Sequence, residues 1–153
     1  MPAIDDFRFE TSHSVIIRGF NFPHDLITDA LGLAPTDVAI AGQSNPSLPS
    51  RNATINTWTH KTPELQYATS AINDGRHLEP LESLITKAYE RRSQLQRLLN
   101  GSEFYFYTVT SSNSPNVIAH LPLRLTRMVV ELGADWYCSV WSEPGTTEFL
   151  RGS

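Results

Sequence analysis

EFYFYTVT, residues 103–110, is the most informative stretch of this chain for its fold. Side chains along a β-strand point alternately to its two faces, and in this stretch both sets are apolar or aromatic. The residues concerned are Phe104, Tyr105, Phe106, Tyr107 and Val109. A strand that needs cover on both faces is typical of the interior of a sheet. We therefore predict that residues 103–110 form a central strand.

Amphipathic segments on either side of this strand predict helices that pack on the sheet. Apolar residues recur at helical spacing from Leu81 to Leu99, and Asn100-Gly101 ends the pattern, so we predict one long helix there. A short strand is predicted at residues 117–121. A second helical pattern covers residues 122–133, and DWYCSVW at 135–141 follows as the last strand.

The first part of the chain contains three further strand patterns. Residues 7–18 carry apolar residues mainly at odd positions, which predicts a half-buried strand. A short helix over residues 24–31 ends at Gly32, and strands are predicted at 37–42 and 54–60. Neither face of 54–60, TINTWTH, is purely apolar, which indicates an edge strand or a strand beside a groove. The following TPELQYATSAI is interpreted as a short helix.

Together these elements give the order βαββαββαβ. We predict an α+β fold with a single-layer, mostly antiparallel sheet, helices on one face and a ferredoxin-like first half. The 153 residues match the length of one domain, with a core from about residue 7 to residue 141 and a tail at 142–153 whose end we expect to be vector-derived. The residues expected in the core are Leu31, Leu84, Ile85, Leu98, Phe104, Phe106, Met128 and Val129.

Composition limits the classes of function. The formal net charge is −4, whereas neutralising nucleic-acid phosphates needs an excess of Lys and Arg, so we do not expect a general nucleic-acid binder. No apolar run reaches the roughly 20 residues of a membrane helix, and the N-terminus shows no export signal. We therefore expect a cytoplasmic protein without membrane contact. Cys138 is the one cysteine, and its aromatic neighbours predict a structural role.

Motifs that carry catalysis or bind cofactors are missing from the sequence. It contains no GxSxG nucleophile elbow, P-loop, HExxH, CxxC or GxGxxG. Its five histidines include no pair at the spacing of metal ligands. We therefore predict no metal, no cofactor and no catalytic residue, while an enzyme of an unfamiliar class stays open.

Four residues are candidates for a ligand site: Arg18, Trp58, His60 and His120. Trp58 and His60 combine an aromatic platform with a polar neighbour, as small-molecule pockets do, and the alternative is a Trp58 packed in the core. Arg18 and His120 each precede a predicted helix, where an anion would meet the helix N-terminus, and the alternative is an ordinary polar surface.

Residues 43–52, QSNPSLPSRN, have no apolar rhythm and contain two prolines, which predicts an exposed loop. The residues of this loop that we consider for contact with another protein are Gln43, Asn45, Leu48 and Arg51. Exposed loops on a rigid scaffold are frequent carriers of binding functions.

Several spaced segments resemble one protein family. They are VIIRGF at 15–20, DLITDALGLAPT at 25–36, Gly42, Trp58, the leucine-rich helix and LTRMVVELGADWYCSV at 125–140. In these segments the chain resembles the bacterial family called domain of unknown function 4279. The resemblance implies a small bacterial α+β protein, usually alone in its chain. It implies no activity and transfers no catalytic residue.

Two hypotheses about function follow from the sequence. The first is a non-catalytic protein-binding module, either a monomer or a homodimer, whose partner is a protein such as a bacterial toxin. The second is a small-ligand sensor or an enzyme that uses a groove near Arg18, Trp58 and His60.

Overall fold

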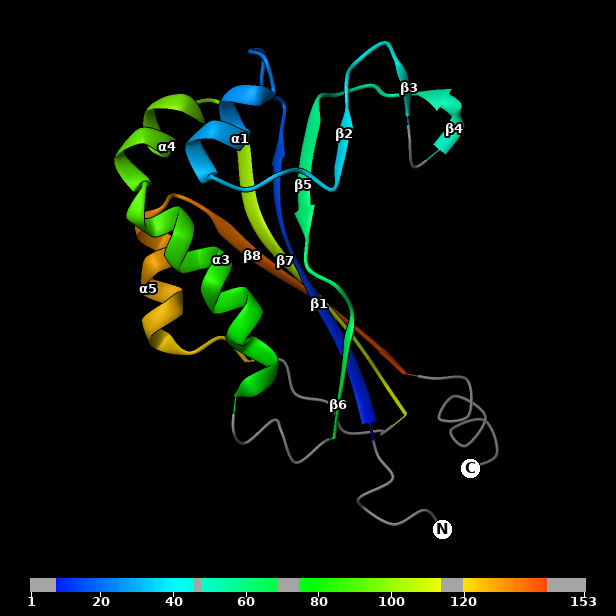
Figure 1. Ribbon diagram of the computed structural model, residues 1–153, viewed down its shortest axis with the longest axis vertical. Helices are drawn as coiled ribbons and strands as arrows, with labels where there is room; N and C mark the ends of the chain where they lie inside the picture. The colour runs from blue at the N-terminus through cyan, green and yellow to red at the C-terminus, as the bar shows by residue number, and fades with distance from the viewer. Residues whose placement is uncertain (1–7, 46–47, 69–74, 114–119, 143–153) are drawn as a thin grey trace.

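The computed structural model describes residues 8–45, 48–68, 75–113 and 120–142, and the statements below concern these residues (Figure 1). The strands are β1 Arg8–Arg18, β2 Asp37–Ala39, β3 Ser44–Asn45, β4 Leu48–Asn52, β5 Thr57–Lys61, β6 Leu65–Ala68, β7 Glu103–Ser112 and β8 Asp135–Ser142. The helices are α1 Asp25–Leu31, α3 Glu79–Glu90, α4 Arg92–Leu98 and α5 Leu123–Glu131, with a 3-10 turn η2 at Arg76–Leu78. The class is α+β, as the sequence predicts.

The main sheet has the order β2-β5-β1-β7-β8, and β6 pairs with the free half of β1. All its strand pairs are antiparallel except β7 with β8, which are parallel and joined through α5. The series β1, α1, β2, β5, α3, β7 has its first strand between the third and the fourth, which is the ferredoxin-like arrangement. The prediction of a mostly antiparallel sheet with a ferredoxin-like first half is thus confirmed.

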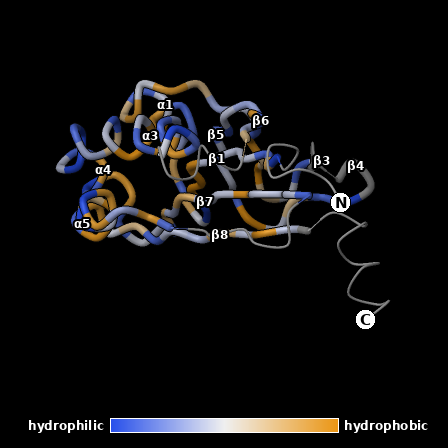
Figure 2. Tube along the Cα trace, turned by 90° about the horizontal axis from the view of Figure 1, so that it is seen from below, coloured by the Kyte–Doolittle hydropathy of each residue, from blue (hydrophilic) through white to orange (hydrophobic). Residues whose placement is uncertain are grey.

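β7 lies between β1 and β8, so the prediction of an interior strand at 103–110 is confirmed. Phe104 and Phe106 point to the side of the helices, where both are buried. The four helices lie on one side of the sheet in Figure 1. Figure 2, in which the molecule is seen from below, shows the helices on that same side. The other face of β7, with Tyr105 and Tyr107, has no described helix over it.

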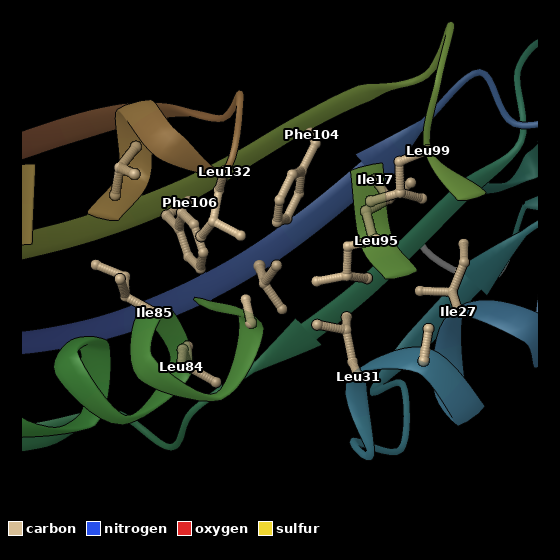
Figure 3. Packing of buried hydrophobic residues seen from close by; sticks show 14 of the residues in the cluster. Ile17, Ile27, Leu31, Leu84, Ile85, Leu95, Leu99, Phe104, Phe106 and Leu132 are labelled. Carbon is tan, nitrogen blue, oxygen red and sulfur yellow. The ribbon is translucent and has the colours of Figure 1, made fainter. Parts of the chain in front are cut away.

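The core forms between the sheet and this helical layer (Figure 3). Val15 and Ile17 of β1 meet the two phenylalanines of β7 and the apolar stripes of the helices. Six of the eight predicted core residues are buried: Leu31, Leu84, Ile85, Phe104, Phe106 and Val129. Leu98 and Met128 are partly buried and pack against the core. Leu95 and Leu99 take the inward positions of the last helical turns before β7, which leaves Leu98 to the side.

The prediction of one helix from Leu81 to Leu99 is wrong, because the structure has two. The chain leaves the helical conformation at Arg91, which has φ −113° and ψ 21°. Arg91 and Arg92 stand where a continuous helix would place its next inward residues after Ala88. Breaking the helix at this point keeps both arginines out of the core and lets Leu95 turn inward.

The short helix expected after Thr62 is also wrong, because residues 65–68 form β6. β1 has 11 residues, and β5 pairs only with its second half, from Ser14 to Arg18. β6 continues the pairing along the first half of β1. Between β5 and β6, Thr62 exchanges hydrogen bonds with the backbone of His13, and Pro63 follows, which cannot donate a backbone hydrogen bond.

Residues 43–52 contain the antiparallel strands β3 and β4, so the loop predicted there is in fact a hairpin, with residues 46–47 outside the described part.

β5 is flanked by β2 and β1, and the interpretation of residues 54–60 as an edge strand is therefore wrong. The actual edge strand is β2, which is only three residues long. Its small residues do not indicate that position in the sequence. Most of the strand predicted at 117–121 lies outside the described residues.

Candidate functional site

The face of the sheet opposite the helices carries a strip of aromatic residues. We call this side the open face, and the aromatic strip is Tyr105, Tyr107, Tyr137 and Trp141. Residues paired across neighbouring strands point to the same face, and Tyr107 is paired with Tyr137 of β8. The rings of Tyr105 and Tyr137 meet edge to face, with centroids 5.2 Å apart. The strip therefore forms one contiguous surface across β7 and β8.

Two members of the aromatic strip are strongly exposed. Tyr137 is 52% exposed and Trp141 is 63% exposed, whereas Tyr105 and Tyr107 are half-buried between neighbouring side chains. The hydroxyl of Tyr107 is hydrogen-bonded to that of Ser139 on the next strand. Single exposed apolar residues are common on protein surfaces, but adjacent aromatic residues on a regular strand pair form a patch.

Charged groups border the strip at one end. Arg18 of β1 is paired in register with Glu103 of β7, and its guanidinium lies 3.5 Å from the Glu103 carboxylate. Partial burial raises the pKa of the Tyr105 phenol, and the nearby guanidinium of Arg18 lowers it in part. The phenol is thus neutral at physiological pH. Strands β7 and β8 together contain two carboxylates, Glu103 and Asp135, and no lysine or arginine.

The structure does not bring the predicted ligand-site residues together. Trp58 is fully buried on the helix side of β5, and its indole N–H donates to the Thr28 hydroxyl at 3.2 Å. His60 lies on the same side and donates from Nδ1 to the Ala34 carbonyl at 2.6 Å. Arg18 points to the open face. A groove shared by these residues is therefore not formed, and the alternative of a Trp58 packed in the core is confirmed.

His120 and the hairpin complete the sequence candidates. His120 is exposed just before α5. Gln43 and Arg51 are exposed on or beside the hairpin, and the backbones of Asn45 and Leu48 pair with each other across it. A role of these hairpin residues in binding stays a prediction.

A buried polar network on the helix side of the sheet was not predicted. His13 of β1 is 1% exposed. Its Nε2 lies 2.8 Å from the carbonyl oxygen of His77, which can only accept, so Nε2 carries the proton. Nδ1 then accepts from the Thr108 hydroxyl at 2.8 Å, and that hydroxyl accepts from the indole N–H of Trp136 at 3.0 Å. The network therefore fixes His13 as one neutral tautomer.

Burial lowers the pKa of His13, and the proximity of His77 lowers it further, while the hydrogen bond to the carbonyl acts in the opposite direction. Both ring nitrogens are used by protein groups, so neither is open to a ligand. The sequence signal for this network is an interruption in the apolar face of β1, where Thr11 and His13 stand between Phe9 and Val15. Thr108 and Thr110 interrupt the same face of β7.

Hollows on the described surface do not coincide with these residues. One of about 700 Å³ is an open groove along the outer side of α3, from Glu79 to Arg91. A smaller one of about 250 Å³ lies where α4 and α5 end, beside Gly101 and Gly133. No group of three His, Cys, Asp or Glu side chains that could hold a metal ion occurs among the described residues. None of the described helices is long and apolar enough to cross a membrane.

These features define a small α+β protein with a ferredoxin-like sheet, one helical layer and an aromatic open face. Residues 9–143 match a protein family described as Domain of unknown function (DUF4279), and the chain belongs to this family. Searches of curated proteins and of solved structures returned no match. The resemblance stated from the sequence is thus confirmed, and it brings no activity with it.

Proposed function

We propose that this protein is a non-catalytic module that binds another protein through the open face of its sheet. The observation that carries the proposal is the aromatic strip, Tyr105, Tyr107, Tyr137 and Trp141, on a regular and supported surface. Tyrosine and tryptophan are enriched among the residues that dominate binding energy at protein interfaces. They present a large contact area with few rotatable bonds, so ordering them on binding costs little.

The sheet supports these side chains rigidly. β7 is paired along its whole length with β1 and from Tyr105 to Ser112 with β8, and Tyr105 and Tyr137 are in edge-to-face contact. The bond between the Tyr107 and Ser139 hydroxyls ties the two strands together on the same face. A surface organised before binding loses less entropy when the partner arrives.

Charge indicates the chemistry of the partner. Glu103 and Asp135 lie at one end of the strip, and Arg18 is paired with Glu103, so Asp135 supplies the net negative charge of these three groups. A partner with an apolar patch bordered by lysine or arginine is complementary to this surface. A toxin with a basic surface is one class of protein that fits, and the module's role would then be to neutralise that toxin.

An aromatic sheet face is also a surface on which nucleic-acid bases can stack. The two strands that hold the aromatic strip contain two carboxylates and no lysine or arginine. Phosphate groups would be repelled by these carboxylates. A protein partner therefore suits the surface better than a nucleic acid does. The enzyme or sensor hypothesis loses its basis, since Trp58 and Arg18 lie on opposite faces.

The test compares the surface variants Tyr105→Ser, Tyr137→Ser and Trp141→Ser with matched controls on the helical layer. Leu123 and Val130 of α5 are 64% and 69% exposed and lie away from the open face, so Leu123→Ser and Val130→Ser serve as controls. Each tagged protein is used to capture partners from an extract of the source organism. Proteins that wild type and controls retain are identified, purified and titrated directly by calorimetry.

We expect the three surface variants to bind the purified partner about tenfold or more weakly, the loss typical of a central aromatic contact. The controls should bind as wild type does. Equal affinity of all variants would refute the open face as the binding surface. Binding of labelled single-stranded RNA or DNA that is lost in the same three variants would instead identify a nucleic-acid surface and overturn the proposal.

A further inference from the structure

β8 forms one edge of the main sheet and is long for an edge strand. It has eight residues, pairs with β7 on one side, and pairs with no described strand on the other. Alternate backbone N–H and C=O groups along such a strand point outward, where they can pair with another strand. β2, the edge on the opposite side of the sheet, has only three residues.

The side chains of β8 do not include the usual protection of an exposed edge. Natural edge strands are commonly blocked by lysine, proline or a bulge. DWYCSVWS contains no lysine and no proline, and its pairing with β7 runs from Asp135 to Ser142 without a shift of register. The only charged residue is Asp135, at the beginning of the strand. The open-face side chains near the edge include two large exposed aromatic residues, Tyr137 and Trp141.

We propose that β8 pairs with β8 of a second copy of this chain, antiparallel and about a two-fold axis at Ser139. In this register Tyr137 lies opposite Trp141 of the partner subunit, and the same pair occurs again across the axis. Antiparallel partners point to the same face, so both aromatic pairs form on the open face. On the helix side, Cys138 lies opposite Val140 of the partner subunit, which is an apolar pair.

The charge on β8 favours this orientation over a parallel one. Parallel pairing in register would set Asp135 against Asp135 of the partner subunit, and like charges directly opposite are destabilising. In the antiparallel register the two carboxylates are about eight residues apart along the strand direction, or roughly 26 Å. A two-fold axis also gives each copy the same contacts and closes the assembly at two chains.

The resulting dimer has one continuous sheet with the helices of both copies on the same side. The two aromatic strips then adjoin and form a single platform on the open face. This pairing uses the backbone edge and leaves the open face accessible, so it does not depend on the function proposed above.

The first test is the molar mass in solution by size-exclusion chromatography with light scattering. Wild type is expected at twice the chain mass of 17.1 kDa. In a double variant with Tyr137→Lys and Trp141→Lys, two lysines lie opposite each other on both sides of the two-fold axis. The double variant with Tyr137→Glu and Trp141→Glu places two glutamates opposite each other in the same way, and like charges in this position are destabilising. Each double variant alone should be a monomer, and their equimolar mixture should return to the mass of a dimer. The control with Leu123→Lys and Val130→Lys on α5 should stay a dimer.

A second measurement does not depend on large charged side chains in the strand. In a Cys138→Ser background, Ser139→Cys places two thiols next to the proposed axis, and mild oxidation should yield a covalent dimer. Ser93→Cys, on the exposed side of α4, should not cross-link in the same background. A monomeric wild type, charged variants that remain dimeric, a mixture that stays monomeric, or absence of the Ser139→Cys cross-link would each overturn the proposal.

The two proposals fail separately. Tyr105 lies on β7, one strand away from the edge, so Tyr105→Ser should weaken binding of the partner protein and leave the mass of the dimer unchanged. If the protein is a dimer but captures no partner protein, only the proposed function is refuted. If the protein is a monomer that captures a partner, and Tyr105→Ser abolishes this capture, only the proposed dimer is refuted.

Discussion

Trp58 offers the sharpest test of the core, because its side chain is fully buried and makes one defined hydrogen bond. A buried tryptophan removes about 150–250 Å² from water, which corresponds to an upper value of about 4–6 kcal/mol at 25 cal/mol per Å². Trp58→Ala keeps the β-carbon but leaves a cavity between β5 and α1. We expect the free energy of unfolding to fall by about 3–5 kcal/mol, as for other large-to-small core changes.

Urea denaturation followed by circular dichroism measures this loss, and thermal unfolding should show a midpoint roughly 6–20 °C lower for a chain of this length. Thr28→Val removes only the acceptor of the indole N–H, and we expect a loss of about 1–3 kcal/mol from the unsatisfied donor. Leu123→Ala, at a residue that is 64% exposed, should change the stability by less than about 0.5 kcal/mol. A loss below about 1 kcal/mol for Trp58→Ala would show that this side chain is not a core anchor.

Three further changes test other parts of the fold by the same denaturation assay. Burial lowers the pKa of His13, so the folded state resists protonation of this side chain. The free energy of unfolding should be highest above the unfolded pKa of about 6.5 and decrease as the pH drops below that value. His13→Gln should show a smaller decrease over the same pH range. Gly32 has φ +66° and closes α1, so Gly32→Ala should cost about 1–2 kcal/mol, whereas an unchanged stability would contradict the left-handed cap. Replacing residues 48–50 by glycine and serine should cost less than about 1 kcal/mol, because β4 pairs with β3 and with no described strand of the main sheet, and a loss as large as that of Trp58→Ala would show that the hairpin is structural.

Local patterns in the sequence were sufficient for the elements that carry their own signal. The double apolar alternation of residues 103–110 predicted the interior position of β7, and the glycine after Leu31 predicted the end of α1. In both cases the residue pattern and the tertiary environment impose the same conformation, so no long-range information is needed.

The elements that were missed depend on distant parts of the chain. Residues 65–68 have no strong strand pattern of their own, and they become β6 because β1 extends beyond β5 and leaves a free edge. The division of the long helix had a local sign, since Arg91 and Arg92 interrupt the apolar stripe. Helix propensity alone does not register that interruption, because arginine is a good helix former.

The candidate sites divide in the same way. Trp58 and His60 looked like a pocket because sequence reasoning cannot tell which face of a strand a second layer covers. Once helices cover that face, a tryptophan there becomes part of the core. His13 was overlooked because the other members of its network lie far away in the sequence: its partner Thr108, and Trp136, which donates to Thr108, come from two strands more than 90 positions later.

The open face follows from the same alternation that placed β7 in the interior. Two apolar faces predict cover on both sides, but the helices cover only the side of Phe104 and Phe106. Tyr105 and Tyr107 face the other way, and β8 adds Tyr137 and Trp141 beside them. Apolar surface in water is unfavourable, and its presence across two adjacent strands is the reason for proposing that this face binds another protein. A tyrosine or tryptophan can stand in water through its polar group until that interaction forms, which a phenylalanine at the same place cannot do.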